Sequence, residues 1–76
     1  MKFQGRFQIG ERESREGKNG EYCKITIRCF GASFKMFLPE NLVPDAVEGK
    51  EAMITFEMVP GKYLIPEIRI VKIEPV

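Results

Sequence analysis

Residues 22–30, YCKITIRCF, alternate between apolar and polar side chains along their whole length. Such a period of two is typical of a β-strand that buries one face and exposes the other. The apolar side consists of Cys23, Ile25, Ile27 and Cys29. The opposite side consists of Tyr22, Lys24, Thr26, Arg28 and Phe30. We therefore predict a strand over residues 22–30 with its apolar side on the core.

The neighbouring segments on both sides repeat this alternation. A first strand is predicted over residues 2–13, with Gly5 and Gly10 as positions where it bends or bulges. Between it and residue 22, the run SREGKNGEY at residues 14–22 predicts a flexible, charged hairpin loop. A tight turn at 31–33 then leads into a third strand over 34–38.

The second half of the chain predicts two more strands. Residues 39–50 form the one long connection, with room for a single helical turn around residues 45–47. A fourth strand follows over 51–59, and Pro-Gly after it predicts a type II turn. The fifth strand covers about 63–74, where the apolar positions change parity near Ile70, which predicts a bulge or burial on both faces.

Five short antiparallel strands in 76 residues predict one all-β domain, residues 1–76. We expect a small five-stranded antiparallel OB-fold-like barrel, because closure removes exposed sheet edges. An SH3-like barrel has the same periodicity and stays open as the alternative. A domain of this size buries only about 60% of its unfolded surface, so a further source of stability is needed.

The cysteine and histidine contents limit which further source of stability this domain can use. The chain has no His and two Cys, which does not fit a structural zinc site. Cys23 and Cys29 would lie roughly 20 Å apart along one strand, too far for a disulfide. Buried free thiols indicate a reducing, cytoplasmic setting, and neither a signal peptide nor a membrane span is expected. Oligomerisation, in the simplest case a homodimer, is left as the stabilising device.

The charges are unevenly distributed, although the net charge is only +1. Residues 1–38 carry eight basic and four acidic side chains, whereas residues 39–76 carry four basic and seven acidic ones. Residues 22–39 contain no acidic side chain at all. This asymmetry favours a polyanionic partner.

The predicted exposed side of residues 22–38 mixes aromatic and basic side chains. Its members are Tyr22, Lys24, Arg28, Phe30, Lys35 and Phe37. Aromatic rings stack on bases and cations neutralise phosphates, so this mixture suits single-stranded nucleic acid. Three simpler interpretations stay open: the two Phe could cover a barrel end or a subunit interface, Tyr22 could pack across strands, and the cations could form a solvated face.

Catalysis is not expected. There is no His, and Ser14, Ser33 and the two thiols have no base motif nearby. No phosphate-binding glycine motif occurs, and no cofactor or metal is implied.

The run Ser-Arg-Glu-Gly-Lys at 14–18, followed by Tyr22, resembles the DNA-binding wing of the filamentous-phage single-stranded DNA-binding proteins of the gene five protein type. VEGKEAMITF at 47–56 and PEIRIVKIEPV at 66–76 resemble the entry to strand four and the closing strand of that family. The resemblance implies an OB-fold homodimer that coats single-stranded DNA during replication of a phage or mobile element.

Carried over by position, the resemblance assigns phosphate contacts to Arg15, Lys18 and Arg69, and base stacking to Tyr22. Two departures are visible. Three residues, 19–21, separate Lys18 from Tyr22 where the family has about one. The hairpin that builds the family's dimer is shortened here to residues 59–63, where Tyr63 is the available aromatic.

The sequence thus predicts a sequence-tolerant single-stranded DNA-binding protein without enzymatic activity. A protein-interaction module anchored by Phe30 and Phe37, or a single-stranded RNA binder, are the alternatives. The predicted binding residues are Arg15, Lys18, Tyr22, Lys24, Arg28, Phe30, Lys35, Phe37 and Arg69.

Overall fold

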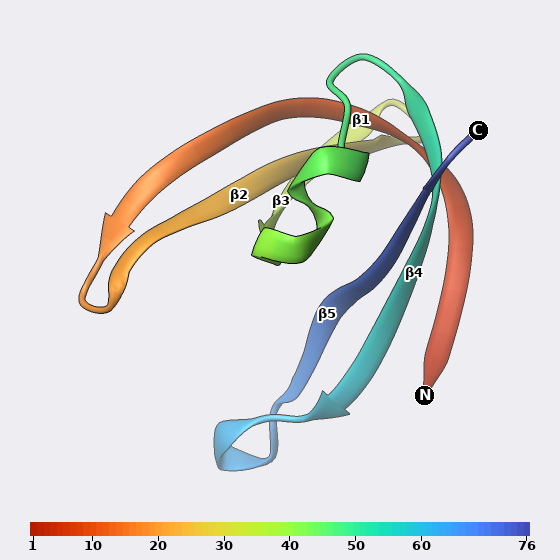
Figure 1. The fold of residues 1–76 in the computed structure, drawn as a ribbon. Helices are drawn as coiled ribbons and strands as arrows, with labels where there is room; N and C mark the ends of the chain where they lie inside the picture. Colours follow the sequence, from red (N-terminus) through yellow and green to blue (C-terminus); the bar gives the residue numbers. More distant parts are fainter.

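Five antiparallel strands form one sheet in the computed structural model, which describes residues 1–76 (Figure 1). Their bounds are β1 Lys2–Gly17, β2 Gly20–Cys29, β3 Ala32–Leu38, β4 Glu51–Pro60 and β5 Pro66–Pro75. The order across the sheet is β3-β2-β1-β4-β5, so the first strand of the chain is the central one. The predicted all-β, five-stranded antiparallel architecture is confirmed. The sheet curves but is not closed by hydrogen bonds, since β3 and β5 are its two edges.

A bulge at Gly10 bends β1, which pairs with strands in both halves of the sheet. Residues 2–8 of β1 pair with β4, and residues 8–17 pair with β2, with a register shift between Ile9 and Arg12. A Cβ at position 10 would lie 3.2 Å from the Cβ of Thr26, so only glycine fits there without a shift of its neighbour. The bulge predicted at this glycine is confirmed, and β1 bends sharply along its length in Figure 1.

A second bulge lies in β5. Thr55 pairs with Lys72, but the next residue, Phe56, pairs with Ile70, so Val71 is the extra residue. Ile70 and Ile73 are consequently both buried although they are three positions apart. The change of parity near Ile70 is thereby explained, as predicted.

The core lies between the two halves of the curved sheet. Its fully buried large side chains are Ile9, Ile25, Ile27, Leu38, Ile54 and Ile70. Phe56 adds an aromatic cluster, stacked on Phe3 with ring centroids 5.3 Å apart and edge-on to Phe7 at 5.4 Å. All eleven buried side chains are apolar, so the core contains no polar group that needs a partner.

A short 3-10 helix, η1 (Glu40–Asp45), packs against this core and contributes Leu42. The helical turn predicted at 45–47 is therefore misplaced by several residues. Pro39 explains the earlier start, because its preset φ of −58° precedes the first turn and its carbonyl accepts a hydrogen bond from the Leu42 N–H at 3.0 Å. None of the helical segments is long and apolar enough to cross a membrane.

The segment predicted as a flexible loop at 14–22 is instead a regular two-stranded hairpin. β1 continues to Gly17, which pairs with Gly20, and only Lys18 and Asn19 form the turn. Gly20 has a φ of +107°, a conformation that other residues rarely adopt. The loop prediction was wrong because charged residues mask strand alternation, while cross-strand pairing holds both sides extended.

Phe30 also differs from its predicted place. It is not the last residue of a strand but the first residue of a two-residue turn, with φ values of 53° for Phe30 and 77° for Gly31. β3 consequently begins at Ala32, inside the turn predicted at 31–33. Positive φ at both central residues is typical of a type I′ turn, which matches the twist of the flanking strands.

This geometry predicts a stabilising substitution. Phe30→Asn should raise the free energy of unfolding by about 1 kcal/mol, because asparagine tolerates the left-handed conformation and Asn-Gly is the favoured type I′ pair. Urea unfolding followed by circular dichroism measures the difference, with Phe37→Asn as a control in an extended strand. An unchanged or lower midpoint for Phe30→Asn would contradict the turn assignment.

The connection between β4 and β5 is longer than the predicted type II turn. Pro60 pairs with Pro66, and the five residues between them contain a second 3-10 segment, η2 (Lys62–Leu64). Tyr63 and Leu64 both have positive φ, 59° and 62°, and both are almost fully exposed. β5 therefore starts at Pro66, after the residues 63–65 that had been assigned to it.

Candidate functional site

The register of β1, β2 and β3 decides which side chains share the outer face of this half of the sheet. Residues paired across antiparallel strands point to the same side. Four rows result: Arg15–Tyr22, Glu13–Lys24–Phe37, Thr26–Lys35 and Gln8–Arg28–Ser33. We call this surface the cation–aromatic face. It brings together six of the nine residues predicted from the sequence: Arg15, Tyr22, Lys24, Arg28, Lys35 and Phe37.

The other three predicted residues lie elsewhere. Lys18 lies at the tip of the β1–β2 hairpin, beyond the last row of the face. Phe30, which was expected beside Arg28, projects fully exposed from the β2–β3 turn. Arg69 lies on β5, at the opposite edge of the sheet from β3, where its Nη2 is 3.4 Å from Oε2 of Glu67.

Tyr22 and Phe37 supply the aromatic part of the face. Tyr22 is half-buried because its ring covers Gly17 on the facing strand, where a Cβ would be 3.2 Å from the ring. Phe37 is 58% exposed on the edge strand β3. An exposed phenylalanine beside a supported tyrosine leaves two ring surfaces open to a planar ligand.

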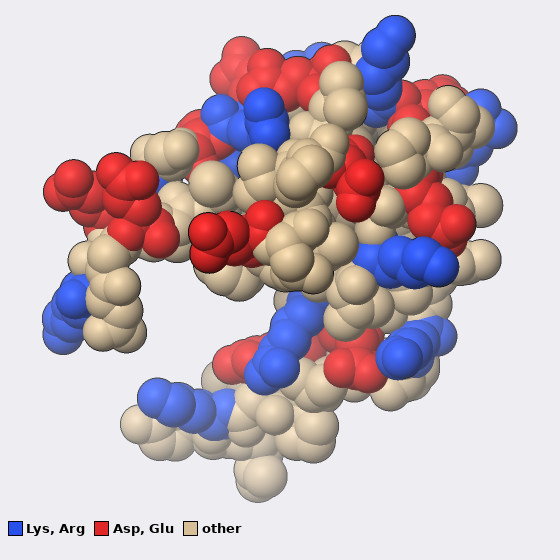
Figure 2. Space-filling view, viewed as in Figure 1, with Lys and Arg blue, Asp and Glu red and all other residues tan.

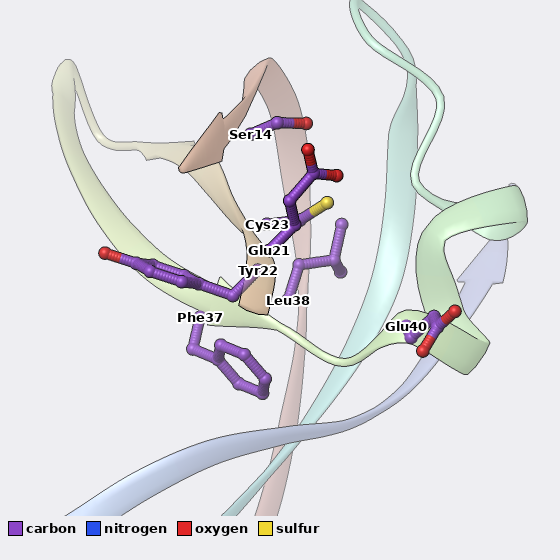
Figure 3. A pocket seen from close by; sticks show the side chains of 7 residues that line it. All are labelled: Ser14, Glu21, Tyr22, Cys23, Phe37, Leu38 and Glu40. Carbon is purple, nitrogen blue, oxygen red and sulfur yellow. The ribbon is translucent and has the colours of Figure 1, made fainter. Parts of the chain in front are cut away.

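Both rings line one shallow pocket of about 320 Å³ at the β2–β3 end of the sheet (Figure 3). The pocket is lined by Ser14, Glu21, Tyr22, Cys23, Phe37, Leu38 and Glu40. In Figure 3 the side chains of Tyr22 and Phe37 lie next to one another, while Cys23 and Leu38 point to the other side of the strands. The pocket is thus lined by side chains from both faces of the sheet.

Three basic side chains on the cation–aromatic face or at the tip of its hairpin make no ion pair. They are Lys18, Lys24 and Arg28. The guanidinium of Arg28 is held close to Gly10, with its Nε 3.3 Å from where a Cβ of that residue would be. The Gly10 bulge thus leaves space for the Arg28 side chain on the outer face. These cations are free to meet an external anion.

Arg15 and Lys35 are instead joined by Glu13, a residue that the sequence did not single out. Glu13 Oε1 accepts a hydrogen bond from Lys35 Nζ at 2.6 Å, and Oε2 accepts from Arg15 Nη2 at 2.8 Å and from Arg15 Nε at 3.2 Å. The hydrogen bonds from Lys35 and then Arg15 lower the pKa of Glu13 to about 2, and the same carboxylate raises the pKa of Arg15. Glu13 therefore stays ionised at neutral pH.

The sequence did contain one signal for this contact. Glu13 and Arg15 are two positions apart, which places them on one side of an extended strand. That signal was lost because the strand was expected to end at residue 13. Because β1 extends to Gly17, the four rows of the face contain four cations and one carboxylate.

The two faces of the β1–β2 hairpin carry opposite charge. Glu16 pairs directly with Glu21, and both point away from the side of Tyr22. Figure 2, viewed from the side of η1, shows acidic side chains gathered along this hairpin and basic ones beyond them at its tip. A like-charged pair opposite one another costs some stability. The pair makes the inner side of this hairpin acidic, whereas the cations lie on the outer side.

The described residues contain no group of three or more His, Cys, Asp or Glu placed to hold a metal ion. Cys23 and Cys29 are free, half-buried thiols. No protein-family model, no curated protein and no solved structure matches this chain.

Proposed function

We propose that this protein binds single-stranded nucleic acid, foremost DNA, with little sequence preference, through the cation–aromatic face. The observation that carries the proposal is the strand register, which collects Arg15, Lys24, Arg28 and Lys35 around Tyr22 and Phe37 on one exposed side. Rings stack on any base, and cations follow the phosphates. Such a face has affinity for a flexible strand without reading its sequence.

The topology supports the same proposal. The strand order β3-β2-β1-β4-β5, with a short helix between β3 and β4, is the order that we expect for an OB-type sheet, here without pairing of β3 with β5. These two strands do contact one another across the open side. OB folds bind oligonucleotides with the face of strands two and three and with the loops that follow strands one and four. The cation–aromatic face, Lys18 and the loop at 61–65 occupy these positions.

The biological setting that we propose is replication of a phage or mobile element, with the protein coating single strands as a homodimer. The setting is supported by the resemblance of residues 14–18 and Tyr22 to a phage DNA-binding wing. Dimerisation is supported separately by the small size of the domain, which gains stability from a partner subunit.

Titration with oligo-dT tests the function. The chain has two tyrosines and no tryptophan, so quenching of tyrosine fluorescence reports on a base stacked at Tyr22. We expect quenching by oligo-dT and a plot of log K against log salt with a slope of about −2 to −4, since single strands release about 0.7 counterion per neutralised phosphate. A duplex of the same length should bind more weakly, because its bases are not free to stack.

Each outcome of this titration has a distinct meaning. Tighter binding of oligo-U than of oligo-dT would favour the RNA alternative. An absence of quenching and of a mobility shift at low salt would reject the nucleic-acid function. The fully exposed Phe30 is the observation that would then favour a protein partner, because exposed aromatics are frequent anchors of protein interfaces.

A further inference from the structure

Glu13 occupies the centre of an anion-binding arrangement. Its two carboxylate oxygens are held by cations from different strands, Oε2 by Arg15 of β1 and Oε1 by Lys35 of β3, so the contact spans β2. Two cations 2.6 and 2.8 Å from a pair of anionic oxygens also suit the oxygens of a phosphate.

We infer that Arg15 and Lys35 form the principal phosphate-binding site of the face, and that Glu13 is a built-in competitor for it. The inference rests on the proposed nucleic-acid function and specifies its mechanism. A backbone phosphate displaces the Glu13 carboxylate and takes its place between the two cations. The carboxylate thereby lowers the affinity for polyanions that cannot also stack on the aromatics.

The exposure of the three side chains makes such displacement feasible. Arg15 is 50% exposed, Lys35 49% and Glu13 29%. Ion pairs this exposed are screened by solvent and are weak, so the carboxylate is held loosely enough to be replaced. No other residue fixes Glu13, whose carboxylate has no hydrogen-bond donor besides Arg15 and Lys35.

The position of the aromatics fits a nucleotide at this site. Arg15 lies directly opposite Tyr22, and Lys35 lies two positions from Phe37 on β3. Tyr22 and Phe37 lie in adjacent rows of the same face as the two cations, so a phosphate between these cations would bring its base within reach of both rings. The site would discriminate between nucleic acid and simple polyanions. Base stacking offsets the cost of displacing Glu13 for nucleic acid, whereas a simple polyanion has no base to stack.

Glu13→Gln tests the inference, because glutamine keeps the size of the side chain and removes its charge. We expect affinity for oligo-dT to rise about fivefold to tenfold and the salt slope to become steeper, since two exposed ion pairs are released. Affinity for inorganic polyphosphate should rise at least as much. Glu74→Gln removes a comparable exposed ion pair, that with Lys72 on β5, and should leave both affinities unchanged.

Two double variants test whether the gain in affinity depends on Arg15 and Lys35. Adding Arg15→Gln or Lys35→Gln to Glu13→Gln should remove most of the gain, because interacting residues are not additive. Thermal unfolding verifies that each variant folds, and Glu13→Thr, which suits a strand, provides a second neutral variant. A gain that persists in both double variants would overturn the assignment of the phosphate site.

The outcomes separate this inference from the function on which it rests. If the wild type binds oligo-dT but Glu13→Gln binds no more tightly, the role of Glu13 as a competitor is refuted and the proposed function stands. If neither protein binds at low salt, both are refuted. If only the neutral variants bind, the proposed function of the natural protein is refuted, although Glu13 does block the site.

Discussion

Tyr22→Ala should weaken binding of oligo-dT by about tenfold to a hundredfold, since stacking of one base on an aromatic contributes about 1–3 kcal/mol. Tyr22 is the ring best held for this purpose, because Gly17 supports it from the facing strand and Arg15 lies beside it. Fluorescence anisotropy of a labelled oligonucleotide measures the change without relying on the tyrosine signal.

Two further variants make the result specific. Tyr22→Phe keeps the ring and should retain most of the affinity. Tyr63→Ala removes the only other tyrosine, almost fully exposed in the 61–65 loop, and should leave the quenching at Tyr22 intact. Wild-type affinity in a correctly folded Tyr22→Ala protein would exclude base stacking on this face.

Phe56→Ala should lower the free energy of unfolding by about 3–5 kcal/mol, the usual cost of removing a buried aromatic. Phe56 is 3% exposed and contacts both Phe3 and Phe7, so its removal leaves a cavity beside these two rings. A domain of 76 residues has little stability in reserve, and we expect much of the variant to be unfolded at 37 °C.

Urea unfolding followed by circular dichroism measures this loss. Leu64→Ala is the control, because it also removes a large apolar side chain but from a position that is almost fully exposed. We expect the control to stay within about 0.5 kcal/mol of the wild type. Equal urea midpoints for Phe56→Ala and the wild type would show that the core does not depend on this aromatic cluster.

The sequence predicted those parts of the fold where apolar spacing is regular. Alternation over residues 22–30 located β2 and its buried Ile25 and Ile27. Gly10 and the parity change at Ile70 located the two bulges, since each interrupts an otherwise regular period. These signals are local and need no knowledge of strand pairing.

The errors occurred where cross-strand pairing, not local pattern, decides the structure. The hairpin at 14–22 is polar, so nothing in its sequence distinguishes an extended ribbon from a loop. Phe30 was assigned to a strand because it continues the alternation of residues 22–29, whereas its positive φ, which is rare for phenylalanine, puts it in a turn. The role of Glu13 depends on Lys35, 22 residues away, and becomes visible only once the register is known.

The central position of β1 has a consequence for the order in which the molecule assembles. The strands that carry the cation–aromatic face are consecutive and joined by two-residue turns, so their pairing closes only short loops. The other side of β1 must wait for a distant part of the chain, since Met1 and Met58 are joined across 57 positions. Non-local pairing of this kind is slow. We therefore expect a growing chain to complete the cation–aromatic face before it completes the core beneath that face.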